Sequence, residues 1–368
     1  MNHLVRRLIP ALVLLSLAAL ASCGDSQGTA LRSAFLKELS ADTVVPAYRD
    51  LDTRTEALAG ALSALEATPT EGTLTTAQSA WRAAREAWMR QEGFRLGPSE
   101  ELHTSAAVNQ VPSTTGIDSL LASDTALTET SVAEQGANRK GMLAMEYLLF
   151  DAEGGNAAVL SRLTAEGNAG VRRRAYLKAL GAVLHTDAVT LRNAWEPDQG
   201  NYAAQLSNAG NDGSTYATQK DAVDAVVNRL IATVETAEKK LSKPLGFETG
   251  GTVRPELEEA RRSDNSVKDL EDTLSGLERV WLGANGDGGL SRVVAASNKQ
   301  TDETVRGDLA AVRSALEAIP PPLRTALHDH RESVEDARAA FSQLRATLAS
   351  EVVANLGVTL TFNDNDGD

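Results

Sequence analysis

Apolar residues recur with helical spacing along most of the chain, in two sets of long segments. Repeats of three to four residues are typical of amphipathic helices that bury one face. The pattern predicts helices at residues 31–66, 75–94, 138–151 and 170–195, then at 216–241, 263–282, 299–319 and 321–355. Residues 196–214, rich in Asn, Gly, Asp and Pro, separate the two sets. We therefore predict an all-α fold of two antiparallel helical bundles, formed by residues 23–200 and 215–368.

Irregular features interrupt this pattern at three places. Pro46 should kink or split the first helix, since proline has no backbone N–H to donate. The insert at residues 95–136 is less regular, and loops of that length are often functional. The best candidate for a strand is the short stretch 358–362 near the end of the chain.

The second predicted helix of each set carries tryptophan on an apolar stripe. Leu270, Leu274, Leu277 and Trp281 stand at i, i+4, i+7 and i+11, a spacing that packs one helix face into a bundle core. Trp81 and Trp88 mark the corresponding helix of the first set. This weak correspondence suggests an ancient duplication.

Composition and charge narrow the class of protein. The 368 residues include 50 acidic and 36 basic side chains, for a net charge of −14, and only 4% are aromatic. A nucleic-acid partner is disfavoured, because binding phosphate backbones requires a concentrated basic face. A single Cys excludes an intramolecular disulfide framework and a zinc site built on several thiolates.

The N-terminus carries a secretion signal. Arg6 and Arg7 precede an apolar run at residues 8–21, too short to span a bilayer comfortably. The run ends in Leu-Ala-Ser-Cys, which resembles a bacterial lipobox, so we predict a lipoprotein signal peptide at residues 1–22 and lipidation of Cys23. The alternative is an ordinary cleaved signal with an incidental Cys. Gly24 after the Cys favours an outer-membrane anchor facing the periplasm, by resemblance to enterobacterial sorting.

Glu146 breaks the polarity rule of its predicted helix. Its neighbours one turn away on either side are all apolar: Met142, Leu143, Leu149 and Phe150. A buried carboxylate needs a cation, a metal or a proton, because desolvating an isolated charge is costly. The simplest structural role is pairing with a buried arginine.

A second stripe mixes aromatic and charged residues. Trp81, Arg85, Trp88 and Glu92 fall at i, i+4, i+7 and i+11, so both tryptophan rings flank the arginine and favour cation–π contact. We expect Arg85 to satisfy Glu92, Glu146 or both at the centre of the first bundle. Such charges form either a binding pocket or a core salt-bridge network that fixes helix register.

The histidine residues provide few candidate metal ligands. The His-Glu-x-x-His zinc motif, a glycine-rich phosphate loop and the Gly-x-Ser-x-Gly elbow are all missing from the sequence. His185 lies among small apolar neighbours, as a hydrogen-bonded core residue would. His103, in the insert, is a possible ligand, which makes Glu92, Glu146 and His103 the candidate set for a divalent metal or iron.

Three separated motifs together resemble the imelysin family of bacterial envelope proteins, classed as M75 peptidases and linked to iron-regulated transport. They are Gly-Met-Leu-Ala-Met-Glu-Tyr-Leu-Leu-Phe at 141–150, Trp88 with Glu-Gly-Phe-Arg-Leu-Gly-Pro at 92–98, and the ending at 356–368. The resemblance implies two helical bundles and a periplasm-facing location. The family hallmark is Gly-x-His-x-x-Glu; Gly141 and Glu146 match it, but Leu143 replaces the histidine. Leucine cannot ligate a metal or transfer a proton, so the peptidase label loses its main support.

These observations leave three hypotheses. The first is a lipid-anchored, non-catalytic protein that binds a metal ion, a metal complex or a partner protein in envelope iron uptake, with Arg85, Trp88, Glu92, Gly141 and Glu146 around its pocket. An envelope metal-transport or redox protein would be the partner. The alternative is an M75-type metallopeptidase with Glu146 as general base. The third is an interaction module whose buried charges serve packing alone.

Overall fold

The computed structural model describes residues 27–102 and 104–361, and every regular element in these ranges is helical. The long helices are α2 (Val45–Ala67), α3 (Glu71–Arg90), α10 (Asn168–Trp195), α12 (Gln219–Leu245), α13 (Ser266–Leu282), α15 (Lys299–Glu317) and α17 (Arg331–Thr347). Shorter helices are α4 (Pro98–Glu101), α5 (Thr104–Asn109), α6 (Thr114–Ala122), α7 (Glu129–Ala133), α8 (Met142–Leu149), α9 (Gly155–Leu163), α11 (Tyr202–Ser207), α14 (Gly289–Ser297), α16 (Leu323–Asp329) and α18 (Val353–Leu356). The 3₁₀ and π segments are η1 (Leu39–Val44), η2 (Glu92–Phe94), η3 (Ala137–Arg139), η4 (Pro255–Leu257) and η5 (Leu348–Val352).

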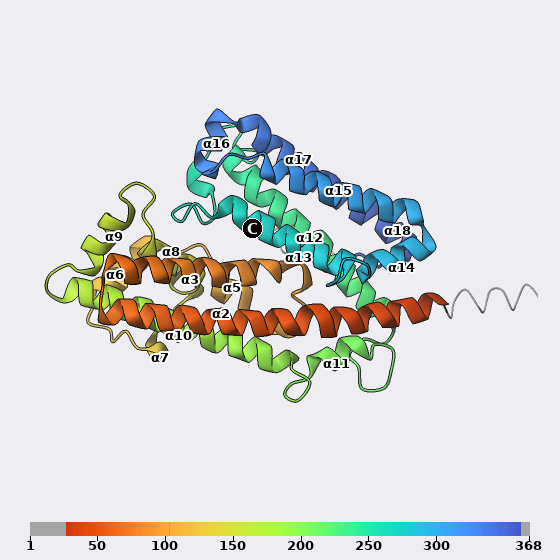
Figure 1. The fold of residues 1–368 in the computed structure, drawn as a ribbon, viewed down its shortest axis with the longest axis horizontal. Helices are drawn as coiled ribbons and strands as arrows, with labels where there is room; N and C mark the ends of the chain where they lie inside the picture. Colours follow the sequence, from red (N-terminus) through yellow and green to blue (C-terminus); the bar gives the residue numbers. More distant parts are fainter. Residues whose placement is uncertain (1–26, 103, 362–368) are drawn as a thin grey trace, which may run out of the picture.

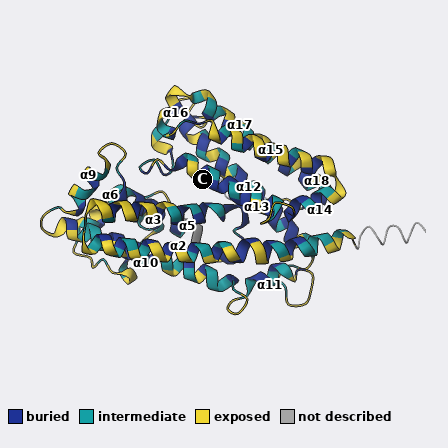
Figure 2. Cartoon of the chain, viewed as in Figure 1, coloured by how far each residue is buried: buried dark blue, intermediate teal, exposed yellow. Residues whose placement is uncertain are grey.

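The long helices form two bundles, as predicted. Helices α2, α3 and α10 pack together in the first bundle, and α12, α13, α15 and α17 in the second, which lies obliquely across the first (Figure 1). Buried residues follow the facing sides of the helices, and exposed residues follow their outer sides (Figure 2). The periodicity of the sequence therefore predicted the all-α architecture correctly. No helix among the described residues is both long and apolar enough to cross a membrane.

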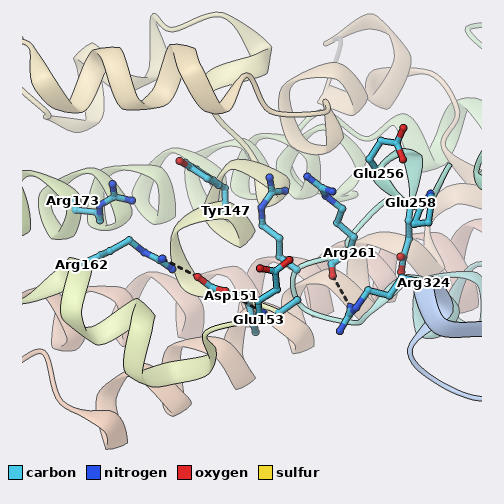
Figure 3. A pocket seen from close by; sticks show the side chains of 13 residues that line it. Tyr147, Asp151, Glu153, Arg162, Arg173, Glu256, Glu258, Arg261 and Arg324 are labelled. Carbon is cyan, nitrogen blue, oxygen red and sulfur yellow. Dashed lines mark hydrogen bonds and ion pairs between the residues drawn. The ribbon is translucent and has the colours of Figure 1, made fainter.

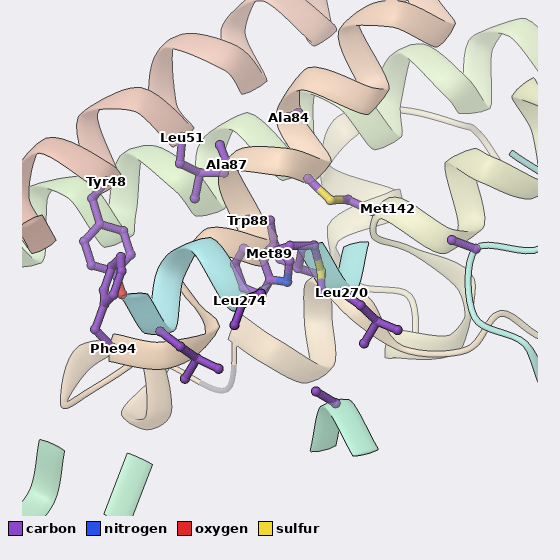
Figure 4. Close-up of a cluster of buried hydrophobic side chains, with 14 of the residues drawn as sticks. Tyr48, Leu51, Ala84, Ala87, Trp88, Met89, Phe94, Met142, Leu270 and Leu274 are labelled. Carbon is purple, nitrogen blue, oxygen red and sulfur yellow. The ribbon is translucent and has the colours of Figure 1, made fainter. Parts of the chain in front are cut away.

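Helices α3 and α13 join the two bundles. Leu270 and Leu274 of α13 are fully buried with Trp88 and Met89 of α3, in a cluster that Figure 4 shows at close range. The backbones approach so closely that a Cβ on Gly276 would lie 2.1 Å from the carbonyl oxygen of Arg90. A side chain at this position would force the helices apart, so glycine sets the distance between them.

Several predicted element boundaries were wrong. The first helix is not split: residues 27–38 are helical and continue through the π segment η1 into α2. Pro46 lies in the first turn of α2, and the wider π turn before it accommodates the missing N–H. The predicted helix at 321–355 is divided, because His330 departs from helical geometry between α16 and α17.

Other differences lie in the connections. The insert at 95–136 contains the short helices α4 to α7, and the separating stretch 196–214 contains α11. Residues 358–361 form no strand, and residue 362 lies outside the described residues. The predicted helix at 138–151 begins only at Met142, because Gly141 has a φ of +82°. A Cβ there would meet the carbonyl oxygen of Val108 at 2.4 Å, so Gly141 allows two chain segments to touch.

Candidate functional site

Arg85 is fully buried where the two bundles meet. Its Nε and Nη2 donate to Oδ2 of Asp269 on α13 at 2.9 and 2.7 Å, and Nη2 also donates to Oε1 of Glu259 at 2.6 Å. Asn109 accepts a further hydrogen bond from Nη1. The expected partners were Glu92 and Glu146, so the structure corrects that pairing: the carboxylates come from the second bundle. They lie 174 and 184 residues away in the sequence, beyond the reach of any local pattern.

The groups around Arg85 complete a charge network. Lys240 of α12 approaches Glu259 at 3.2 Å, and Asn265 donates to the second oxygen of Asp269 at 2.7 Å. Although burial opposes it, the cations Lys240 and Arg85 lower the pKa of Glu259 to about 2. For Asp269, burial outweighs the attraction of Arg85 and raises the pKa. The hydrogen bonds from Arg85 to Asp269 and Glu259 connect α3 to the second bundle, so the network works as an inter-bundle clamp.

Glu146 is held by a turn of the second bundle. Its Oε1 accepts hydrogen bonds from the backbone N–H of Arg262 at 2.9 Å and of Ser263 at 2.9 Å, and from Oγ of Ser263 at 2.8 Å. The turn is unusual, because Ala260 and Asp264 both have left-handed backbones, with φ of +54° and +57°. Such conformations cost about 1 kcal/mol or more per residue, so the contacts of the turn must stabilise it. Two successive N–H groups aimed at one oxygen form an anion-binding concavity that the protein fills with its own carboxylate.

The apolar surroundings of Glu146 affect its proton. Burial raises the pKa of this carboxyl, whereas the hydrogen bonds from Ser263 and the charges of Arg85 and Arg262 act in the opposite direction. Arg85 therefore acts on Glu146 through space rather than through an ion pair. Leu143, at the position of the family histidine, is 2% exposed and belongs to the apolar core.

The remaining predicted residues have other roles. Glu92 is buried on η2 and pairs with Arg95 at 3.3 Å, while its backbone carbonyl accepts from Thr233 at 2.8 Å. The cation–π contact predicted for Arg85 occurs with Trp81, at 5.8 Å from the ring centroid. The ring of Trp88 instead faces Arg95, at 5.3 Å.

The predicted metal set stays a prediction. Glu92 and Glu146 have separate partners, and His103 lies outside the described residues. Across 27–102 and 104–361, no three His, Cys, Asp or Glu side chains are grouped as a metal site would require. Cys23, the predicted lipidation site, also lies outside these ranges.

A pocket of about 300 Å³ opens beside the helix that carries Glu146. Five arginines line it: Arg162, Arg173, Arg261, Arg262 and Arg324. Figure 3 shows side chains from α8, α9, α10 and the 255–262 segment converging on it. We call this cavity the arginine pocket. Arg261 and Arg262 come from the same turn that holds Glu146. The hydrogen bonds between this turn and Glu146 therefore also position the pocket.

Sequence reasoning missed this pocket. The local signals were the doublet Arg261-Arg262 before a predicted helix start and the run of three arginines at 172–174, and such runs are usually solvated. The other three arginines come from α9, α10 and α16, and no spacing rule connects them. The helix itself begins at Ser266 rather than at 263, because the turn at 260–264 precedes it.

Comparisons with known proteins agree with the fold. The sequence profile of the imelysin family (peptidase M75) matches residues 44–350. A solved structure of an iron-regulated protein A precursor from Parabacteroides distasonis has a TM-score of 0.76 and 19% identity, covering 87% of this chain and 94% of its own. An imelysin-like protein from Psychrobacter arcticum has a TM-score of 0.73 and 17% identity, covering 91% of this chain and 98% of its own. No curated protein matches the sequence.

Proposed function

Since the chain belongs to the imelysin family, we propose that it is a non-catalytic binding protein of the bacterial envelope that takes part in iron uptake. The name of the Parabacteroides structure, an iron-regulated protein, supports the link to iron. The lipobox at Cys23 supports a lipid anchor, with the two bundles facing the periplasm. An envelope transport or redox protein would then receive what this protein binds.

The surroundings of Glu146 support the non-catalytic part of the proposal. A metallopeptidase general base acts on a water molecule that a metal ion has activated, and neighbouring histidines commonly hold that metal. Oε1 of Glu146 already accepts three hydrogen bonds from Arg262 and Ser263. With Leu143 buried one turn earlier, this helix supplies no imidazole beside the carboxylate. The arrangement suits a structural anchor beside a binding pocket better than it suits a peptidase centre.

The geometry of the site favours binding of a metal complex over binding of a bare metal ion. Cationic side chains repel a metal ion, whereas a complex whose ligands carry excess negative charge would be attracted to them. The arginine pocket is lined by five cations, and it lies directly beside Glu146 through its neighbour Tyr147. We therefore place the binding function in this pocket.

An iron-uptake assay in the host bacterium tests the proposal. Deleting the gene should lower the accumulation of radioactive iron under iron limitation, and the intact gene should restore it. Glu146→Gln should restore it as well, because the glutamine oxygen can still accept from Ser263. A Glu146→Gln protein that reaches wild-type levels in the envelope but does not restore uptake would favour the peptidase alternative. Unchanged uptake in the deletion strain would contradict the role in iron uptake.

The anchor is tested separately. Cys23→Ser removes the predicted lipidation site and should abolish the incorporation of labelled palmitate that the wild-type protein shows. Absence of labelling in the wild type, or equal labelling of the variant, would contradict the lipid anchor.

A further inference from the structure

We propose that the arginine pocket binds a small oxyanion with two or more negative charges, of polycarboxylate or phosphate chemistry, through Arg261 and Arg262. This inference rests on the proposed function in one respect: it takes the bound anion to be the carrier of iron. The anion site itself is argued from the geometry of the pocket.

The first argument is the balance of charge within the pocket. Arg162 is neutralised by Asp151 at 2.8 Å, and Arg324 pairs with Asp264. Among the residues that the structure describes, Arg261 and Arg262 form no ion pair. They lie side by side in the sequence on the turn at 260–264, which holds their backbone in place.

The acidic residues of the pocket offset these two cations only in part, since Glu256 and Asp151 act on them through space without forming ion pairs with them. Glu256 is exposed and pairs with Arg254, and Glu153 is also exposed. Glu258 is buried and accepts a hydrogen bond from Ser266 at 2.7 Å. Its pKa is raised to about 7, mainly by burial, so much of its negative charge is absent at neutral pH.

The second argument is the cost of burying Arg262. Its guanidinium lies 5.1 Å from the ring centroid of Tyr147 and is half-buried, and this desolvation lowers its pKa despite the nearby charge of Glu146. A half-buried cation that has no ion pair gains from an arriving anion, because the anion replaces part of the hydration it has lost. Planar guanidinium groups also match the oxygen pairs of carboxylate and phosphate.

A third cation, Arg173, lies across the pocket from Arg261 (Figure 3). Arg173 of α10 is only loosely paired with Asp118, at 3.7 Å, and Oη of Tyr147 donates to the same aspartate at 2.8 Å. Figure 3 shows Arg173 and Tyr147 on one side of the pocket and Arg261 on another. A ligand lying between them would meet positive charge from two elements.

Size and net charge select a small ligand. At about 300 Å³, the cavity lies at the lower end of the range for small-molecule sites, which is about 300–1,000 Å³. The chain as a whole carries a charge of −14, which repels large polyanions such as nucleic acids. A local cationic pocket in such a protein suits an anion that fits inside it.

Calorimetric titration of the folded protein lacking its signal peptide tests the proposal with three probes: citrate, ferric citrate and inorganic phosphate. Wild-type protein should bind at least one of them. Arg261→Gln and Arg262→Gln should each weaken binding by about tenfold or more, the loss expected for one charge-assisted contact. Arg313→Gln is the matched control, since it removes the same charge from a partly exposed pair with Glu278 on helices that do not line the pocket. It should leave binding within about twofold. Circular dichroism melting verifies that each variant is folded.

The outcomes separate the two proposals. Citrate binding without phosphate binding assigns carboxylate chemistry, and the reverse assigns phosphate chemistry. Absence of binding by all three probes at millimolar concentration overturns the anion site, as does binding that the folded double variant Arg261→Gln/Arg262→Gln leaves unchanged. Anion binding that is lost in the double variant, combined with normal iron uptake in the deletion strain, would retain the site and reject the proposed function.

Discussion

The carboxylate of Glu146 and the hydroxyl of Ser263 meet at 2.8 Å across the boundary of the two bundles, although 117 residues separate them in the sequence. The backbone N–H of Ser263 binds the same oxygen at 2.9 Å. This contact fixes the turn at 260–264 against α8, and the same turn supplies Arg261 and Arg262 to the arginine pocket. Structural anchoring and ligand binding therefore depend on one short segment.

Ser263→Ala should destabilise the protein by removing one hydrogen bond to a buried carboxylate. Bonds to charged groups contribute about 1.5–3 kcal/mol, so we expect a loss in that range in the free energy of unfolding by urea. Ser275→Ala is the control, because its hydroxyl bonds only to the carbonyl of Glu271 one turn earlier. The control should change stability by less than about 0.5 kcal/mol. Equal effects of the two substitutions would contradict the role of Ser263.

Arg85→Met should be more damaging, because it leaves Asp269 buried without its cation. Removing one partner of a buried ion pair costs about 3–5 kcal/mol. Adding Asp269→Asn should recover part of the loss, since the uncompensated charge is then gone. Urea unfolding of the two single variants and the double variant measures the coupling. Strictly additive effects would show that the two side chains act independently.

Gly276→Ala should force α3 and α13 apart. The new Cβ would lie 2.1 Å from the carbonyl oxygen of Arg90, a backbone atom that cannot rotate away. Overpacking of this kind costs about 1–3 kcal/mol, and thermal unfolding would measure it. Gly60→Ala, on an exposed part of α2 with no atom within 4 Å, should instead stabilise the protein by about 0.4–1 kcal/mol. Stabilisation by both substitutions would contradict the close approach.

Glu258 should make stability depend on pH. Its pKa is 4.5 in the reference state and about 7 in the folded protein, mainly because it is buried. Between these values the folded state holds a proton that the unfolded chain has released, so stability should fall as pH rises through this interval. Glu258→Gln should remove that fall and stabilise the protein above pH 7 by up to about 3 kcal/mol.

Urea unfolding across the pH range measures this effect. Below pH 4.5, the variant and the wild type should have similar stability. Asp272, whose pKa burial raises to about 6, contributes to the same interval and remains in the variant, so a smaller slope should persist. An unchanged slope would show that Glu258 is already ionised in the folded protein at low pH.

The sequence by itself determined the helices and which faces they bury. Trp81, Arg85 and Trp88 share one face because their spacing follows the helical period, and all three are buried as that spacing requires. The apolar neighbours of Glu146 likewise predicted its burial, which is confirmed at 1% exposure. These properties depend on residues within a few turns of one another, which a linear pattern records.

Only the tertiary structure decided what the buried charges contact. Arg85 was expected to pair within its own bundle, yet it binds Glu259 and Asp269, which the packing of α13 on α3 brings to it. The left-handed backbone of Ala260 has no signature in the sequence, because alanine rarely adopts it without support from tertiary contacts. The arginine pocket gathers side chains from separate elements. Each of these features depends on how the two bundles dock, and their docking is set by long-range packing rather than by local periodicity.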